Sequence, residues 1–173
     1  MILTGTEIIS AVDSGEIIIE LYCESKINPN SYDLTLHRFL YTYEDEILDP
    51  KIKYPELRQH RISEEGFLLL PGKLYLGRTN EYTPTDTYVP MLEGKSSIGR
   101  LGIDIHKTAG VGDIGFRGNW TLELAVTQPV YVYPDMPICQ IIYYVPKGGT
   151  TIQYNGKYQD SLNVLASKIY EEM

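Results

Sequence analysis

Three stretches of the 173-residue sequence combine residue types that could do chemistry. The first, EGKSSIGR, runs from Glu93 to Arg100 and holds two glycines, two hydroxyls and two cations within eight residues. If a short helix begins at Ser96, its free N–H groups, the serine hydroxyls and Arg100 can converge on one anion. The stretch is not a P-loop, because that motif needs a glycine five residues before Gly94, where Val89 stands. A capped helix start with a solvated arginine is the alternative.

The second stretch, HKTAGVGDIGF, runs from His106 to Phe116. Its three glycines let the backbone pass close to a ligand, so that main-chain groups could recognise a base. Asp113 could accept a hydrogen bond from a sugar hydroxyl or orient a water, or it could simply stabilise a turn. His106 on its own is more often a packed or solvated histidine than a catalyst.

The third stretch centres on Glu123. Trp120, Leu122, Leu124 and Val126 share one face of a predicted strand, and Glu123 lies on the other face among apolar neighbours. A carboxylate that lines a pocket loses water, which favours its protonated form and suits proton transfer near neutral pH. Alternation alone leaves open whether this face is a pocket or ordinary surface.

The composition excludes several functional classes. A net charge of −8 argues against a broad basic surface for a nucleic-acid polymer, so any phosphate site must be local. Cys23 and Cys139 are far apart and form no CxxC pair, which fits a reducing cytoplasm and no cysteine metal site. The H-x-E and P-C-x-x-C motifs of the zinc nucleobase deaminases are absent. No signal peptide or long apolar run is present, so we expect a soluble protein.

The elements that must position these residues are mostly short strands. Fifteen tyrosines, fifteen glycines and ten prolines favour strands broken by turns, and the length favours a single domain, residues 1–173. A short helix is predicted from Thr4, with Glu7 as its capping-box partner, to Ser14-Gly15. The charged stretch 45–65 is expected to be a surface excursion, and residues 151–173 a flexible tail that orders on ligand binding. The pattern predicts an all-β fold with a closed or nearly closed architecture.

The sequence resembles the dCTP deaminase family over nearly its whole length. The likeness begins with Met1-Ile2-Leu3 and the short helix, and continues through INPNSYDL (27–34), LPG (70–72) and TNEY (79–82). It is closest in GKSSIGRLG (94–102), in Thr108-Ala109-Gly110 with Asp113 and Gly115-Phe116, and in WTLE (120–123).

The resemblance implies a distorted β-barrel of the dUTPase-like type, assembled as a homotrimer whose active sites are shared between neighbouring subunits. It implies dCTP and dUTP as ligands, a magnesium ion held by the triphosphate and not by protein side chains, and no zinc.

The resemblance also implies roles for individual residues. Glu123 would relay protons between the attacking water, ring N3 and the leaving ammonia, while Ser96 and the backbone near Ala109 hold that water. The phosphates would be bound by Lys95, Ser97, Arg100 and, from the tail, Lys157 and Tyr158. Arg100 would also act on Glu123, Asp113 would receive the 3′-hydroxyl, and Thr108 belongs to the base and sugar loop.

Three positions depart from the family pattern. Lys95 stands where arginine is common, Ser161 where a glutamine near the base is usual, and Gly112 where an apolar residue precedes Asp113. Gly110 matches a subset of the family that cleaves the product dUTP to dUMP, and in that subset Asp113 would help to activate the attacking water. The alternatives are a plain dUTP pyrophosphatase and a non-catalytic nucleotide-binding regulatory protein.

Overall fold

The chain begins with the predicted helix. In the computed structural model, which describes all residues 1–173, α1 spans Gly5–Asp13 and is capped by Thr4, whose hydroxyl accepts a hydrogen bond from the Glu7 amide at 3.4 Å. Ile8 and Ala11 on one side of the helix are buried. No helix of the chain is both long enough and apolar enough to cross a membrane.

The rest of the fold consists of short strands and three single-turn helices. The strands are β1 (Ile27–Asn28), β2 (Ser31–Thr35), β3 (Phe39–Thr42), β4 (Arg58–Arg61), β5 (Phe67–Leu69), β6 (Tyr75–Tyr82), β7 (Val89–Gly94), β8 (Ile103–Asp104), β9 (Asn119–Val126), β10 (Val130–Val132) and β11 (Pro137–Tyr144). The single turns are η1 (Glu24–Lys26), α2 (Ser96–Gly99) and η2 (Ile169–Glu172). The predicted all-β class is confirmed.

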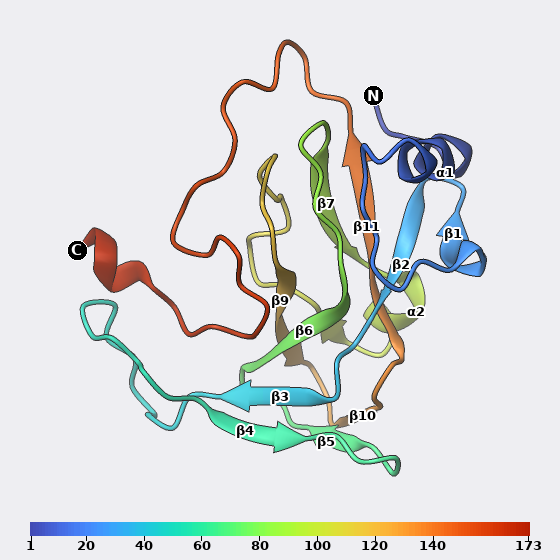
Figure 1. The fold of residues 1–173 in the computed structure, drawn as a ribbon. Helices are drawn as coiled ribbons and strands as arrows, with labels where there is room; N and C mark the ends of the chain where they lie inside the picture. Colours follow the sequence, from blue (N-terminus) through green and yellow to red (C-terminus); the bar gives the residue numbers. More distant parts are fainter.

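The strands form three antiparallel sheets, with orders β1-β2-β11-β7, β10-β5 and β4-β3-β6-β9-β8 (Figure 1). The hydrogen-bonded ladders do not close into one barrel. The pairing of β6 with β9 shifts register between Arg78 and Tyr82. The sheet that contains β2 is joined to β6 by a single isolated bridge, between Leu36, just after β2, and Thr79. The architecture is therefore a set of sheets packed on a shared core.

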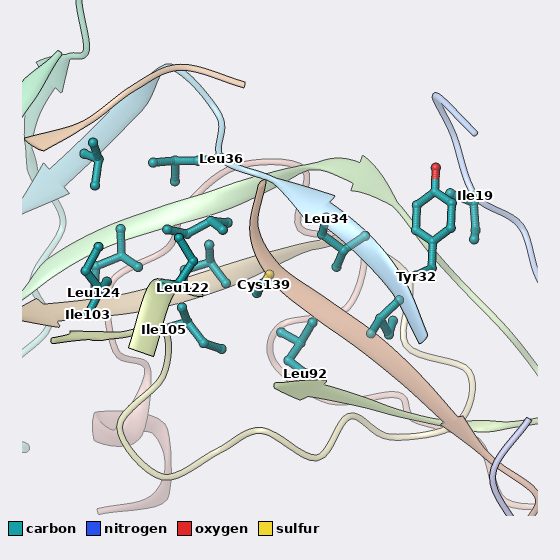
Figure 2. Packing of buried hydrophobic residues seen from close by; sticks show 14 of the residues in the cluster. Ile19, Tyr32, Leu34, Leu36, Leu92, Ile103, Ile105, Leu122, Leu124 and Cys139 are labelled. Atoms are coloured by element: carbon teal, nitrogen blue, oxygen red, sulfur yellow. The ribbon is translucent and has the colours of Figure 1, made fainter. Parts of the chain in front are cut away.

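The core lies between the two larger sheets, and period-two alternation places its side chains there. Figure 2 shows Leu34 from β2 and Leu36, which follows that strand, gathered with Leu122 and Leu124 from β9, with Cys139 of β11 among them. These five side chains are all fully buried. The same alternation turns the intervening residues of β9 away from the core.

Glu81 is a charged residue inside this framework. Its side chain is fully buried and pairs with Lys26 at 2.7 Å. It also accepts hydrogen bonds from the amide of Thr35 at 2.9 Å and from the Thr35 hydroxyl at 2.8 Å. A buried carboxylate is tolerated only with such partners, so Glu81 ties η1, β2 and β6 together.

Candidate active site

A cleft of about 960 Å³ opens beside β9. Its walls come from β9, from the loop after β8 and from the C-terminal segment, which passes this part of the molecule in Figure 1. Five of the predicted site residues line it: Ala109, Asp113, Glu123, Lys157 and Tyr158.

Glu123 lies on the cleft side of β9. Its neighbours Leu122 and Leu124 point into the core, so the Glu123 side chain emerges on the opposite face, where it is half-buried. Its Oε2 accepts a hydrogen bond from the Lys107 amide at 2.8 Å, and its own amide donates to the Ile105 carbonyl at 3.0 Å. The face of the strand that alternation left undecided is therefore a pocket wall.

The glycine-rich loop brings Ala109 and Asp113 to the cleft. The Leu92 amide donates to the Gly110 carbonyl at 2.7 Å, and the Gly112 amide donates to the Pro90 carbonyl at 2.8 Å, which ties the loop to β7.

Two of its glycines are required by close packing. A Cβ on Gly110 would lie 2.7 Å from His106 Nε2, and one on Gly112 would lie 2.3 Å from the Trp120 ring. Any side chain at either position would force a ring or the backbone to move. Gly112 stands before Asp113, where the family usually has an apolar residue. The Trp120 ring fills the space that a side chain at position 112 would need.

The tail contributes Lys157 and Tyr158. Lys157 forms an ion pair with Glu172 of η2, and this hydrogen bond raises the pKa of Lys157 above its ordinary value. The Tyr158 hydroxyl accepts from the Lys168 amide at 2.9 Å. The ammonium groups of Lys157 and Lys168 lie 5.6 Å and 5.8 Å from the centre of the Tyr158 ring. The tail thus carries two cations beside an aromatic ring.

The other five predicted residues lie outside this cleft. Lys95, Ser96, Ser97 and Arg100 are on or next to α2, and Thr108 precedes Ala109 in the loop. Ser96, Ser97 and Arg100 are exposed, whereas Lys95 is partly buried in an ion pair with Asp33 of β2. A single chain therefore does not bring the α2 cations and hydroxyls into the cleft that contains Glu123.

Alternation and motif spacing missed the aromatic wall of the cleft. Phe116 stands 4.8 Å from Trp120 and 5.8 Å from Tyr154, measured between ring centres. Strand alternation places Trp120 on the core side of β9, yet its side chain lines the cleft while packing against the core. The abundance of tyrosine was a signal for such a wall, but it gave no position.

Acidic residues of the C-terminus were also missed. Glu171 and Glu172 line the same cleft, on the side that carries Lys157. Ser161, singled out for its departure from the family, lines the cleft as well, and its hydroxyl donates to the Tyr158 carbonyl at 2.8 Å. No three histidine, cysteine, aspartate or glutamate side chains gather as a metal-binding group.

Known proteins resemble this chain along its length. The model of the dCTP deaminase-like family matches residues 2–145. A "dCTP deaminase, dUMP-forming" from Clostridium beijerinckii is 54% identical over 172 residues, which cover 99% of this chain and 98% of that protein. Proteins of the same name from Clostridium acetobutylicum and Leptospira biflexa are each 51% identical, with the same coverage of both chains.

A solved structure has a similar fold. The crystal structure of 2′-deoxycytidine 5′-triphosphate deaminase from Agrobacterium tumefaciens superposes with a TM-score of 0.68 at 21% identity. The match covers 84% of this chain but 46% of that one, so this chain spans about half its length. With the family model covering most of the sequence and relatives more than half identical over their full length, the chain belongs to the dCTP deaminase-like family.

Proposed function

We propose that this protein deaminates dCTP and then hydrolyses the triphosphate, giving dUMP, pyrophosphate and ammonia. The relatives at 51% to 54% identity support this reaction, since each is named as a dUMP-forming dCTP deaminase. The observation that carries the proposal is Glu123, a half-buried carboxylate on the wall of a cleft large enough for a nucleotide.

The base would be deaminated by an activated water. Glu123 takes a proton from the water as it adds to C4 of the cytosine and passes this proton to N3. A second transfer, from the added hydroxyl to the amino group, lets ammonia leave and restores the carboxylate. Phe116, Trp120 and Tyr154 offer flat apolar surfaces for the base, and Ala109 and Ser96 would hold the water.

The triphosphate would be bound by cations and hydroxyls. Lys157 and Tyr158 are already in the cleft, and Lys95, Ser97 and Arg100 form a second set around α2. Asp113 would receive the 3′-hydroxyl and help to activate the water that cleaves the triphosphate. Magnesium would bind through the phosphate oxygens and neutralise their charge. The residues present fit a magnesium ion held in this way, because lysine, arginine and serine side chains bind phosphate oxygens. They would hold the nucleotide and leave the ion to the phosphates.

The shared site would be completed in a homotrimer. One subunit has Glu123 in its cleft, and a neighbour would supply Ser96, Ser97 and Arg100, whose side chains are exposed and free for an intersubunit contact. This arrangement accounts for the separation of the two sets of residues within one chain. Two free cysteines are compatible with the expected cytoplasmic location.

A product assay tests the proposed function. The purified protein is supplied with dCTP, dUTP or dCMP and Mg²⁺, and nucleotides, pyrophosphate and ammonia are measured after chromatography. We expect dUMP, pyrophosphate and ammonia in equal amounts from dCTP. Hydrolysis of dUTP with dCTP left intact would support the pyrophosphatase alternative, accumulation of dUTP would reject the second step, and no turnover would reject both.

A further inference from the structure

The two carboxylate oxygens of Glu123 have different surroundings. Oε2 accepts the hydrogen bond from the Lys107 amide at 2.8 Å, while Oε1 has no hydrogen-bond partner within the chain. The Lys107 side chain plays no part in this contact, because its ammonium group is drawn to Asp104, 3.1 Å away on the surface. Lys107 therefore meets Glu123 through its main chain alone.

The Lys107 amide is held in place from both sides. On one side, the Glu123 amide donates to the Ile105 carbonyl at 3.0 Å, and Ile105 is buried in the core. On the other side, the His106 ring packs against Gly110, whose carbonyl accepts from the Leu92 amide. The donor to Oε2 is thus fixed to β9 and β7, and it does not depend on a mobile side chain.

We propose that the main-chain N–H of Lys107 positions Glu123 for proton transfer, by holding Oε2 as a permanent acceptor and reserving Oε1 for the transferred proton. This inference rests on the proposed deamination. When the water adds to C4, its proton goes to Oε1 and the carboxyl becomes neutral. Oε2 is then the carbonyl oxygen and still accepts from Lys107. The same proton leaves Oε1 for the base, so the proton count balances and the carboxyl plane need not rotate.

An amide-to-ester replacement at residue 107 tests the proposal directly. Incorporation of the α-hydroxy analogue of lysine replaces the N–H by an ester oxygen and keeps the lysine side chain. The ester also weakens the His106 carbonyl as an acceptor, but that carbonyl accepts no main-chain hydrogen bond. We expect kcat with dCTP to fall by about ten- to a hundredfold, the scale of one hydrogen bond to a charged group. KM should change by less than about twofold, because the contact does not touch the nucleotide.

The pH profile separates positioning from general damage. A hydrogen bond to a carboxylate favours its ionised form, so its loss should move the acid limb of kcat to higher pH. Other charged groups on the cleft are Asp113, Lys157, Glu171 and Glu172, and the Asp104–Lys107 pair lies beside it. All of these stay the same between the amide and ester proteins.

The matched control is the same ester at Lys147, an exposed residue whose amide makes no hydrogen bond in the chain. That protein should match the wild type. If the wild type deaminates dCTP and the ester at residue 107 retains both its kcat and its acid limb, the inference is wrong. If the wild type does not deaminate dCTP, the proposed function itself is wrong. This result differs from an active wild type with an equally active ester protein, so the experiment distinguishes the two failures.

A second measurement does not depend on activity or on the stability of the ester protein. In ¹⁵N-labelled protein, the Lys107 amide proton of the wild type should resonate downfield of its position in Glu123→Ala, because this variant removes the acceptor of its hydrogen bond. A Lys107 amide resonance that is the same in the wild type and in Glu123→Ala would overturn the inference.

Discussion

Glu123 illustrates how far residue order determines a site. The alternation of β9 sorts its side chains into two faces, and it predicted that Glu123 shares its face with Thr121 and not with Leu122. Which face is wet depends on what covers it. This face is covered by the 105–113 loop and by the tail. The tail is distant from β9 in the sequence, and the loop is held against β9 and β7 by tertiary hydrogen bonds, so neither could be placed from the alternation of β9.

The two cysteines give a prediction at the same scale. Cys23 is exposed, and a hydrogen bond with Ser25 lowers the pKa of its thiol, whereas burial raises the pKa of Cys139 far above its ordinary value. Because the thiolate is the reactive form, iodoacetamide at pH 8 should modify one thiol per native chain, and peptide mapping should identify Cys23. Cys139 should react only after unfolding.

The Cys23→Ser variant is the control and should take up no reagent until it is denatured. Equal rates of modification of both thiols in the native protein would contradict the burial of Cys139 at the centre of the core.

At the scale of elements, the sequence predicted most of what the structure contains, with specific exceptions. The helix after Thr4 and the alternating strand β9 follow from local rules, and both are confirmed. The position of α2 relative to the cleft could not be predicted, because it depends on sheet order and on β8, two residues long, beside β9. The aromatic cluster around Phe116 was missed because it joins the loop, the strand and the tail.

The C-terminal element η2 offers a second prediction. Glu172 forms an ion pair with Lys157, the cleft cation expected to bind phosphate, so the substrate must compete with this carboxylate. The Glu172→Gln variant should lower the KM for dCTP by about two- to fivefold, a range suited to an exposed ion pair. Steady-state kinetics at low ionic strength would measure it, since salt screens such pairs.

Glu56→Gln is a suitable control, because it removes the same charge from an exposed position outside the cleft. A KM for Glu172→Gln equal to or above that of the control would show that the pair does not compete with the nucleotide.

At the scale of the whole molecule, the separation of Glu123 from Ser96 and Arg100 is the feature that calls for a partner. Closed cyclic assembly lets one surface of each subunit meet a different surface of the next, which would join the two sets in every site. The resemblance to the family implies that this assembly is a homotrimer, so sedimentation should find a trimer.

Subunit mixing tests the shared site itself. Glu123→Gln and Arg100→Ala should each be nearly inactive alone, and they should regain activity when mixed through a denaturation and refolding step. Random assembly of equal amounts restores both wild-type residues in about one quarter of the sites of a cyclic trimer. No gain over the separate variants would contradict a site built from two subunits.

The most direct measurement of the proposed mechanism is ammonia release from dCTP by Glu123→Gln, compared with the wild type and with the exposed-site control Glu20→Gln. Removal of a proton-transferring carboxylate should lower kcat by about 10² to 10⁴-fold, with dCTP binding largely retained in calorimetry. Glu20→Gln should behave as the wild type. Turnover of dCTP by Glu123→Gln at the wild-type rate would contradict the assignment of Glu123 as the proton-transferring group.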